Sequence, residues 1–103
     1  MYTVKVTHTR PSVDVPFYWE TNLADHETYL TTLKSHYDSH LTLEDRIYSD
    51  DRLTVTQSMT ADSIEEYTTG RTLSNNDVDL VKYWLTRDEY NYNNNISKIL
   101  TEI

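Results

Sequence analysis

The chain has 103 residues, a formal net charge of −8, a pI near 4.7 and no cysteine. This length predicts a single domain, and the lack of cysteine excludes disulfides, thiolate nucleophiles and cysteine-ligated metals. The negative charge argues against a nucleic-acid partner, because phosphate binding needs clustered lysine and arginine. The acidic residues are dispersed along the chain, which favours a solvated negative surface over an imitation of DNA.

No apolar run approaches the roughly 20 residues that a membrane span requires. The first residues also lack the basic and apolar regions of a signal peptide. We therefore expect a soluble, cytoplasmic protein with no membrane partner.

Residues 2–9 alternate between apolar and polar side chains and predict the first strand. Its more apolar face comprises Tyr2, Val4, Val6 and His8, and its polar face comprises Thr3, Lys5, Thr7 and Thr9. Both prolines fall within residues 10–19, which indicates an irregular connection. This connection is rich in large apolar side chains, namely Val13, Phe17, Tyr18 and Trp19. We expect it to fold back over the core or to cover a neighbouring molecule.

Residues 24–40 show helical periodicity, and Asn22 is a suitable N-cap in front of them. The apolar residues share one arc of about 120° on a helical wheel. They are Leu23, His26, Tyr29, Leu30, Leu33, Tyr37, His40 and Leu41. We expect this helix to lie on a sheet, with Leu30 and Leu33 against its apolar face.

Residues 41–59 contain two more alternations, which we expect to pair as a hairpin. The apolar parity comprises Leu41, Leu43 and Ile47 in the first run and Leu53, Val55 and Met59 in the second. The apolar faces of the two strands coincide only when the hairpin loop has an odd number of residues. This favours a three-residue loop over residues 50–52. Ile47 then lies opposite Val55, Leu43 opposite Met59, and Asp45 opposite Gln57.

The remaining chain predicts two helices and a strand. We expect Thr60 to cap a short helix over residues 61–68, with Ile64 and Tyr67 inward. Gly70 then ends this helix, and residues 72–75 form a loop. Asn76 or Asp77 begins a third helix, whose inward arc comprises Val78, Val81, Trp84, Leu85 and Tyr92. The asparagines at 93–95 end it, and residues 96–103 form the last strand.

The resulting order, β-α-β-β-α-α-β over essentially the whole chain, resembles the α+β ferredoxin-like fold. More narrowly, it is similar to the dimeric α+β barrel superfamily, which includes the antibiotic-biosynthesis monooxygenases. The resemblance rests on element order, and it implies an antiparallel sheet with helices on one face and a homodimer of two such sheets packed face to face. Members include cofactor-free oxygenases, haem-degrading enzymes and proteins without a known activity. The Asn, Trp and His arrangement of the haem-degrading members has no counterpart around Trp19 or Trp84, and we expect no cofactor.

The polar side of the predicted sheet is the first candidate site. It comprises Thr3, Lys5, Thr7, Thr9, Thr42, Glu44, Arg46, Tyr48, Thr54, Thr56 and Ser58. If a dimer encloses this face, Lys5 and Arg46 would bind an anionic ligand, with Glu44 and Tyr48 available for proton transfer. The alternative, which we favour, is a sheet with one face in water.

His8 and His26 form the second candidate site. His8 shares its parity with Val4 and Val6, and His26 lies within the apolar arc of its helix. Asp45 is expected on the same sheet face as His8, and a buried His–Asp pair could act as a general base. We favour the alternative that these polar groups satisfy one another by hydrogen bonding at the margin of the core.

His36 and His40 stand four residues apart on the predicted helix, a spacing that can chelate a divalent metal. The metalloprotease pattern requires Glu directly after the first histidine, whereas Tyr37 follows His36 here. No third ligand stands at a suitable spacing, so we expect no bound metal.

These patterns favour a non-enzymatic, homodimeric ferredoxin-like protein with a regulatory or viral accessory role. The alternative is a small-molecule-binding protein or a cofactor-free, oxygenase-like enzyme of the dimeric α+β barrel type, which requires an enclosed pocket. We expect the homodimer because a chain of this length has a small core. Its contact would be the polar sheet face, with the long stems of Lys5 and Arg46, or the aromatic connection over residues 13–19.

Overall fold

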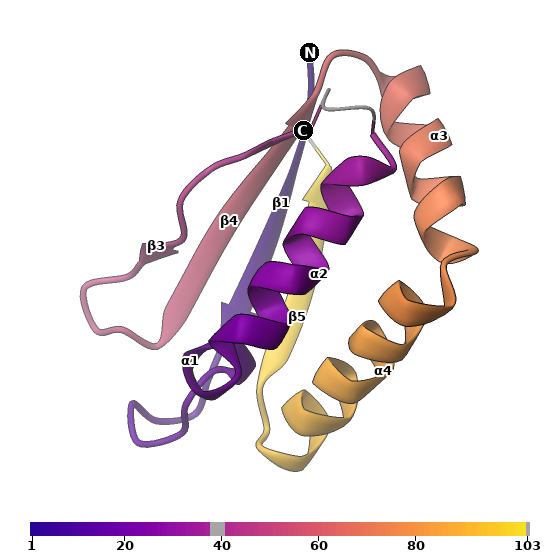
Figure 1. The fold of residues 1–103 in the computed structure, drawn as a ribbon. Helices are drawn as coiled ribbons and strands as arrows, with labels where there is room; N and C mark the ends of the chain where they lie inside the picture. The colour runs from indigo at the N-terminus through magenta and orange to yellow at the C-terminus, as the bar shows by residue number, and fades with distance from the viewer. Residues whose placement is uncertain (38–40, 103) are drawn as a thin grey trace.

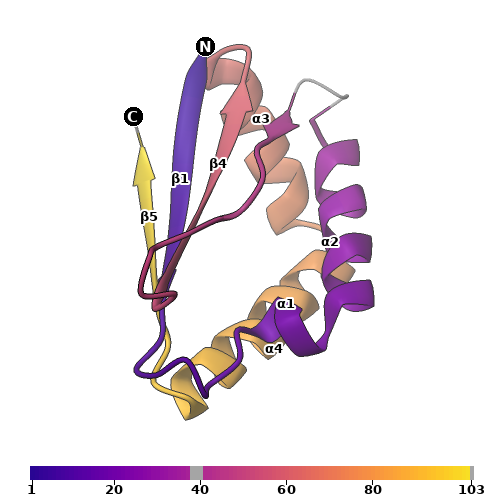
Figure 2. The same ribbon diagram turned by 90° about the vertical axis from the view of Figure 1, so that its left-hand side faces the viewer.

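The computed structural model describes residues 1–37 and 41–102 of the chain. These residues form a mixed α+β fold with a five-stranded antiparallel sheet on one side and four helices on the other (Figures 1 and 2). The strands are β1 (Tyr2–Thr9), β2 (Thr42–Leu43), β3 (Ile47–Tyr48), β4 (Thr54–Ala61) and β5 (Ser97–Glu102). The helices are α1 (Tyr18–Thr21), α2 (Leu23–Ser35), α3 (Ile64–Asn75) and α4 (Val78–Asn93).

β1 lies inside the sheet, between β4 and β5. It pairs with β4 along its whole length, which places His8 opposite Val55. On its other side it pairs with β5, which places Lys98 opposite His8. Because opposite residues of an antiparallel pair share a face, these three side chains point to the same side of the sheet as the buried Val4. The strand predicted over residues 2–9 is confirmed. The strand predicted over residues 96–103 is confirmed from Ser97 to Glu102, and residue 103 lies outside the described residues.

The first run of the predicted hairpin is interrupted and forms two short strands. β2 keeps the predicted register, since Leu43 pairs with Met59. In β3 the predicted register is wrong by one residue, because Ile47 pairs with Thr56 and not with Val55. Residues 44–46, between the two strands, contain the extra residue that produces this shift.

The connection after β3 explains why the predicted register fails. The Ser49 amide donates to the Thr54 carbonyl oxygen at 2.8 Å, and the Arg52 amide donates to the Ser49 carbonyl oxygen at 2.9 Å. Arg52 adopts a left-handed conformation with φ of 61°. Four residues, 50–53, therefore connect the strands in place of the predicted three, and an even number exchanges the faces. Ile47 consequently points away from the helices and is 70% exposed.

The connection over residues 10–19 folds back over the chain's own core and ends in the short helix α1, which sequence reasoning missed. Phe17 and Trp19 are buried and their rings stack with centroids 4.7 Å apart. The Glu20 carboxylate accepts hydrogen bonds from the Phe17 amide at 2.7 Å and from Arg10 Nη1 at 3.0 Å. This carboxylate thereby closes the start of α1 and fixes the connection to the sheet. The aromatic side chains of this connection, Phe17, Tyr18 and Trp19, are therefore buried within the chain itself.

α2 matches the predicted helix on the sheet but is shorter, because it ends at Ser35. Leu33 is buried as predicted, and Leu30 is half-buried. Leu23 was expected inward and is instead 53% exposed. His36 and Tyr37, which were predicted to continue the helix, form a turn, and the rest of the predicted continuation, residues 38–40, lies outside the described residues.

α3 begins later and ends later than predicted. β4 continues to Ala61, so Ser63 and not Thr60 caps the helix, with Ser63 Oγ accepting from the Glu66 amide at 3.1 Å. The predicted loop over residues 72–75 is wrong, since these residues belong to the helix. Tyr67 is buried as predicted, whereas Ile64 is exposed.

Gly70 lies inside α3 and does not end it. It is buried, and a Cβ atom at this position would overlap the ring of Tyr37. Glycine at this position therefore allows the Tyr37 ring to pack closely against α3, and it does not terminate the helix.

α4 begins after Asp77, as predicted, and the Asp77 side chain accepts hydrogen bonds from the amides of Asp79 and Leu80. Its predicted inward arc is only partly correct, because Trp84 packs against the core while other members of the arc do not. Apolar side chains of that arc point to solvent, namely Val78, Leu85 and Tyr92. The side chains that are buried instead are Leu80, Arg87 and Asn91.

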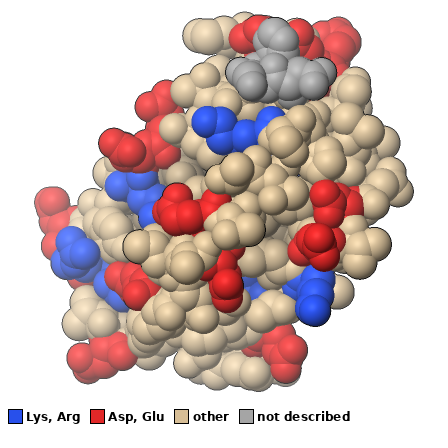
Figure 3. Space-filling model, viewed as in Figure 1, with Lys and Arg blue, Asp and Glu red and all other residues tan. Residues whose placement is uncertain are grey.

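The acidic residues are scattered over the face of the molecule seen in Figure 3, with lysine and arginine side chains between them. Within residues 1–37 and 41–102, none of the helices combines the length and the hydropathy that crossing a membrane requires.

Candidate functional site

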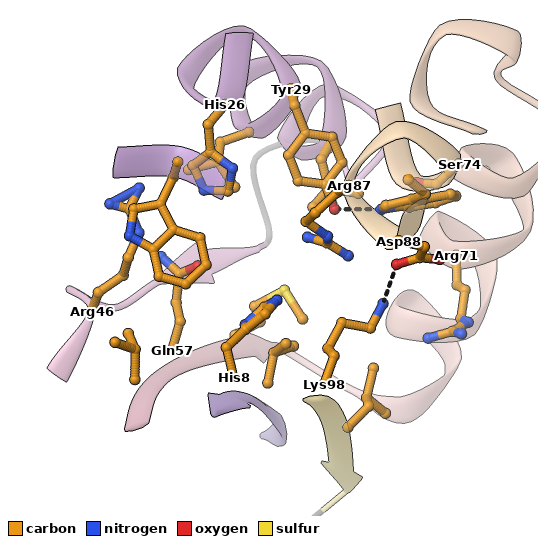
Figure 4. A pocket seen from close by; sticks show the side chains of 18 of the residues that line it. His8, His26, Tyr29, Arg46, Gln57, Arg71, Ser74, Arg87, Asp88 and Lys98 are labelled. Atoms are coloured by element: carbon orange, nitrogen blue, oxygen red, sulfur yellow. Dashed lines mark hydrogen bonds and ion pairs between the residues drawn. The ribbon is translucent and has the colours of Figure 1, made fainter. Parts of the chain in front are cut away.

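A cavity of about 280 Å³ lies between the sheet and the helices. Its walls come from β1, β4 and β5 on one side and from α2, α3 and α4 on the other. Figure 4 shows side chains of both layers pointing into the space between them. This volume is close to the lower end, roughly 300 Å³, of cavities that hold small organic molecules.

Most of the cavity wall is apolar or aromatic. The aliphatic and Met side chains are Val6, Leu30, Leu33, Val55, Met59 and Leu100, and the aromatic ones are Trp19, Tyr29, Tyr37, Tyr67 and Trp84. Trp84 Nε1 donates to Tyr29 Oη at 2.6 Å. The Tyr29 ring also stacks on Tyr83, with centroids 4.1 Å apart and planes 10° apart. These contacts hold the aromatic wall in place before any ligand arrives.

Two of the cationic side chains that line the cavity come from opposite layers. Arg87 comes from the buried face of α4, and only 6% of it is exposed. Among the described residues its Nε has no hydrogen-bond partner, and its guanidinium lies 5.7 Å and 5.9 Å from the ring centroids of Tyr83 and Tyr29. Lys98 comes from β5, and its Nζ lies 3.8 Å from Asp88 Oδ1 at the edge of the cavity. Burial, followed by repulsion from Arg87, lowers the pKa of Lys98.

His8 and His26 meet at this cavity, as their positions in the sequence predicted. His26 Nδ1 is hydrogen-bonded to the hydroxyl of Tyr83. The Nε2 atoms of both rings are buried and have no hydrogen-bond partner in the part of the chain that the structure describes. Burial, with smaller contributions from Arg87 and Lys98, lowers the pKa of His8 to about 3. Burial, with Arg46 and Arg87 adding to it, lowers the pKa of His26 to about 4. Both rings are therefore neutral at physiological pH.

The carboxylate expected to join these histidines does not reach them. Asp45 lies in the irregular segment between β2 and β3, is exposed and does not line the cavity. The predicted register that brought Asp45 to the apolar face fails because the chain is irregular from residue 44 to residue 46. Among the described residues, His8 and His26 therefore have no carboxylate with which to form a catalytic pair.

The ligand-binding set predicted on the polar sheet face is divided between the two sides of the sheet. Lys5 is exposed on the face away from the helices, whereas Arg46 lines the cavity and pairs with Glu27 at 3.6 Å. Tyr48 also lies on the helix side, where its hydroxyl accepts from Trp19 Nε1 at 3.2 Å. Glu44 is exposed and only its backbone makes hydrogen bonds to β4. These four residues do not form one site.

His36 contacts the carboxylate of Asp77, the N-cap residue of α4, with its Nε2 2.8 Å from Asp77 Oδ2. Its predicted metal-chelating partner, His40, lies outside the described residues. Within residues 1–37 and 41–102 there is no group of three or more His, Asp or Glu side chains with the geometry of a metal site.

Sequence reasoning missed Arg87 and Lys98. The predicted inward arc of α4 was centred on the wrong face of the helix, because it included three apolar residues that are exposed, Val78, Leu85 and Tyr92. A second arc, with i, i+4, i+7 and i+11 spacing, comprises Leu80, Trp84, Arg87 and Asn91 and would have placed Arg87 inward. Lys98 is identified only by the pairing of β5 with β1, which no local pattern indicates.

Neither a protein-family model nor a curated protein matches this sequence.

Proposed function

We propose that this chain binds a small organic molecule with an aromatic or aliphatic body in the cavity between the sheet and the helices. The observation that carries the proposal is the cavity itself, with its rigid aromatic wall and buried polar nitrogens that have no protein partner among the described residues. Buried donors and acceptors without a partner cost about 1–3 kcal/mol each, and a bound molecule would relieve that cost. Cavities of this kind are the usual binding sites of small molecules.

We propose that binding occurs without chemical transformation. A general base needs a partner that orients it and a pKa near the working pH. Asp45 is exposed outside the cavity, and burial keeps the pKa values of His8 and His26 at about 3 and 4. This supports a regulatory or accessory binding role over the alternative of a cofactor-free, oxygenase-like enzyme.

We also propose that the chain is ferredoxin-like and forms a homodimer through the open face of its sheet. The strand order β2-β4-β1-β5, with antiparallel neighbours, supports the first point. Two large apolar residues on the face away from the helices support the second, since Ile47 is 70% exposed and Ile99 is 60% exposed. Ile99 pairs with Thr7 and Ile47 pairs with Thr56, which places both isoleucines on that face.

The binding proposal is tested by titration calorimetry with 2-naphthamide, a neutral bicyclic aromatic amide. We expect saturable one-to-one binding to the native chain. Leu30 lines the cavity from α2, so Leu30→Trp fills it and should abolish binding, while Leu85→Trp adds the same side chain at an exposed position of α4 and should leave binding unchanged. Met59→Phe fills the cavity from the sheet and repeats the test if Leu30→Trp does not fold. No heat of binding with the native chain, or equal binding by the filled variants, would overturn the proposal.

A further inference from the structure

The cavity has a charge opposite to that of the protein as a whole. The chain has 17 Asp and Glu residues against 9 Lys and Arg residues. Among the described residues, the cavity lining reverses this ratio, because it contains one acid, Asp88, and four cations, namely Arg46, Arg71, Arg87 and Lys98. Figure 4 shows the cationic groups around the cavity, with Asp88 on the side where Lys98 reaches it. A small acidic protein that gathers cations around this cavity favours anions there.

Three of these four cations already have a partner or contact with water. Arg46 pairs with Glu27 at 3.6 Å, and Lys98 pairs with Asp88 at 3.8 Å. Arg71 is an exposed residue of α3 and donates to the Tyr67 hydroxyl at 3.0 Å.

Arg87 differs from them because it is buried and no carboxylate pairs with it in the part of the chain that the structure describes. Its nearest favourable contacts are the faces of the Tyr29 and Tyr83 rings, which compensate only part of the lost hydration of a guanidinium. A buried charge without a counter-charge is strongly unfavourable, so its retention in the cavity calls for a negative group. His8 and His26 are neutral and contribute no further positive charge.

We infer that the ligand of this cavity is a monocarboxylate whose carboxylate group pairs with the guanidinium of Arg87, beside Lys98, while its apolar body lies against the aromatic wall. This inference rests on the proposed function and specifies its ligand class. The planar guanidinium matches a carboxylate in two parallel hydrogen bonds. One buried uncompensated charge needs one negative charge, which favours a carboxylate over a phosphate monoester with its charge of roughly −1.5 to −2. The cavity volume of about 280 Å³ limits the body to one or two rings or a short chain.

The test compares 2-naphthoate with 2-naphthamide, two probes of nearly equal shape that differ in charge, by titration calorimetry at pH 7. We expect the native chain to bind the carboxylate at least tenfold more tightly than the amide. Arg87→Met keeps the unbranched stem and removes the charge, so the ratio of carboxylate to amide affinity should fall to near one. Lys82→Met removes a charge from the exposed side of the same helix and should preserve the difference. A buried charge without a counter-charge is unfavourable, so we expect Arg87→Met to remain folded.

The outcomes separate this inference from the proposal on which it rests. Equal binding of both probes by the native chain would overturn the carboxylate inference and leave the cavity a binding site. Equal weakening of both probes in Arg87→Met would also overturn it, because the guanidinium would then shape the cavity without recognising charge. If neither probe binds, the proposed function fails as well. Lys98→Met is a second test variant, and it should weaken the binding of 2-naphthoate several-fold without weakening that of 2-naphthamide.

Discussion

The ring of Tyr37 packs directly against the backbone of Gly70, so a Cβ atom on Gly70 would overlap three carbon atoms of that ring. Tyr37 follows the last turn of α2, and Gly70 lies in the middle of α3. The contact therefore joins two helices that border the cavity. Gly70 does not have a positive φ, so the requirement for glycine is one of space.

We predict that Gly70→Ala destabilises the protein by about 1–3 kcal/mol, the usual cost of overpacking a core. This sign is informative because alanine is otherwise better than glycine inside a helix by roughly 1 kcal/mol. Urea denaturation measures the change, and Thr69→Ala, at the exposed neighbouring position, is the matched control. Tyr37→Leu should relieve the overlap, so the double variant should lose less than the sum of the single variants. A stabilising Gly70→Ala would show that Tyr37 can move aside.

The elements that follow a simple period were predictable, and those that depend on register or close packing were not. The alternation in residues 2–9 identifies β1, and Asp77 marks the start of α4 correctly. β3 was misplaced by one residue because a bulge and an even-numbered turn leave no mark in an apolar pattern. Gly70 was taken for a helix end because the ring that requires it comes from residue 37.

The candidate site was predictable to the same limited extent. Parity and helical arc together brought His8 and His26 to one place, since both signals are local. Arg87 and Lys98 escaped prediction because a charged residue on an amphipathic helix or edge strand normally faces water. Their place in the cavity follows from how the layers pack.

Leu33 provides a test of the α2 face that packs on the sheet. It is 5% exposed and belongs to the larger core cluster, so we expect Leu33→Ala to cost about 2–4 kcal/mol of unfolding free energy. Leu23, which is 53% exposed on the same helix, is the control, and Leu23→Ala should cost under about 0.5 kcal/mol. Chemical denaturation of both variants measures the two values. Similar losses would contradict the observed orientation of α2.

The buried histidines predict a loss of stability in weak acid. Their pKa values of about 3 for His8 and about 4 for His26 lie below the roughly 6.5 of an unfolded histidine. Between those pKa values the unfolded chain binds more protons than the folded chain does. The free energy of unfolding therefore has its full value above about pH 6.5 and falls as the pH falls below it. Each histidine contributes up to about 1.4 kcal/mol per pH unit in this window, or about 2 kcal/mol between pH 7 and pH 5.

Urea denaturation at pH 7 and at pH 5 tests this prediction. His8→Leu removes one of the two titrating rings from an apolar site beside Phe17 and Trp19, so its stability should fall about half as much over this range. An unchanged pH dependence in His8→Leu would mean that His8 is protonated in the folded protein.

Asp88 is predicted to compete with a carboxylate ligand for Lys98. Its Oδ1 lies 3.8 Å from Lys98 Nζ, a long and partly exposed contact that an incoming anion can replace. Asp88→Asn removes the competing charge, and we expect 2-naphthoate to bind about two- to fivefold more tightly, since partly exposed charge pairs of this kind are worth up to about 1 kcal/mol. Asp79→Asn, in the first turn of the same helix and outside the cavity, should change affinity little. Titration calorimetry of both variants decides the matter, and weaker binding by Asp88→Asn would contradict the competition.

The proposed homodimer predicts a particle of twice the chain mass whose stability depends little on salt. Arg46 lies on the helix side, which leaves Lys5 and the exposed Ile47 and Ile99 as the features of the open sheet face. A contact made mainly of apolar and threonine side chains is weakly screened by ions. Sedimentation at micromolar concentration, at low and high salt, measures the association. Ile99→Lys should dissociate the dimer because it places a charge in the contact, whereas Val78→Lys, at an 80% exposed position of α4, should not. A single 12.2 kDa species of the native chain would rule out the homodimer and leave the cavity of each chain as the only binding site to be tested.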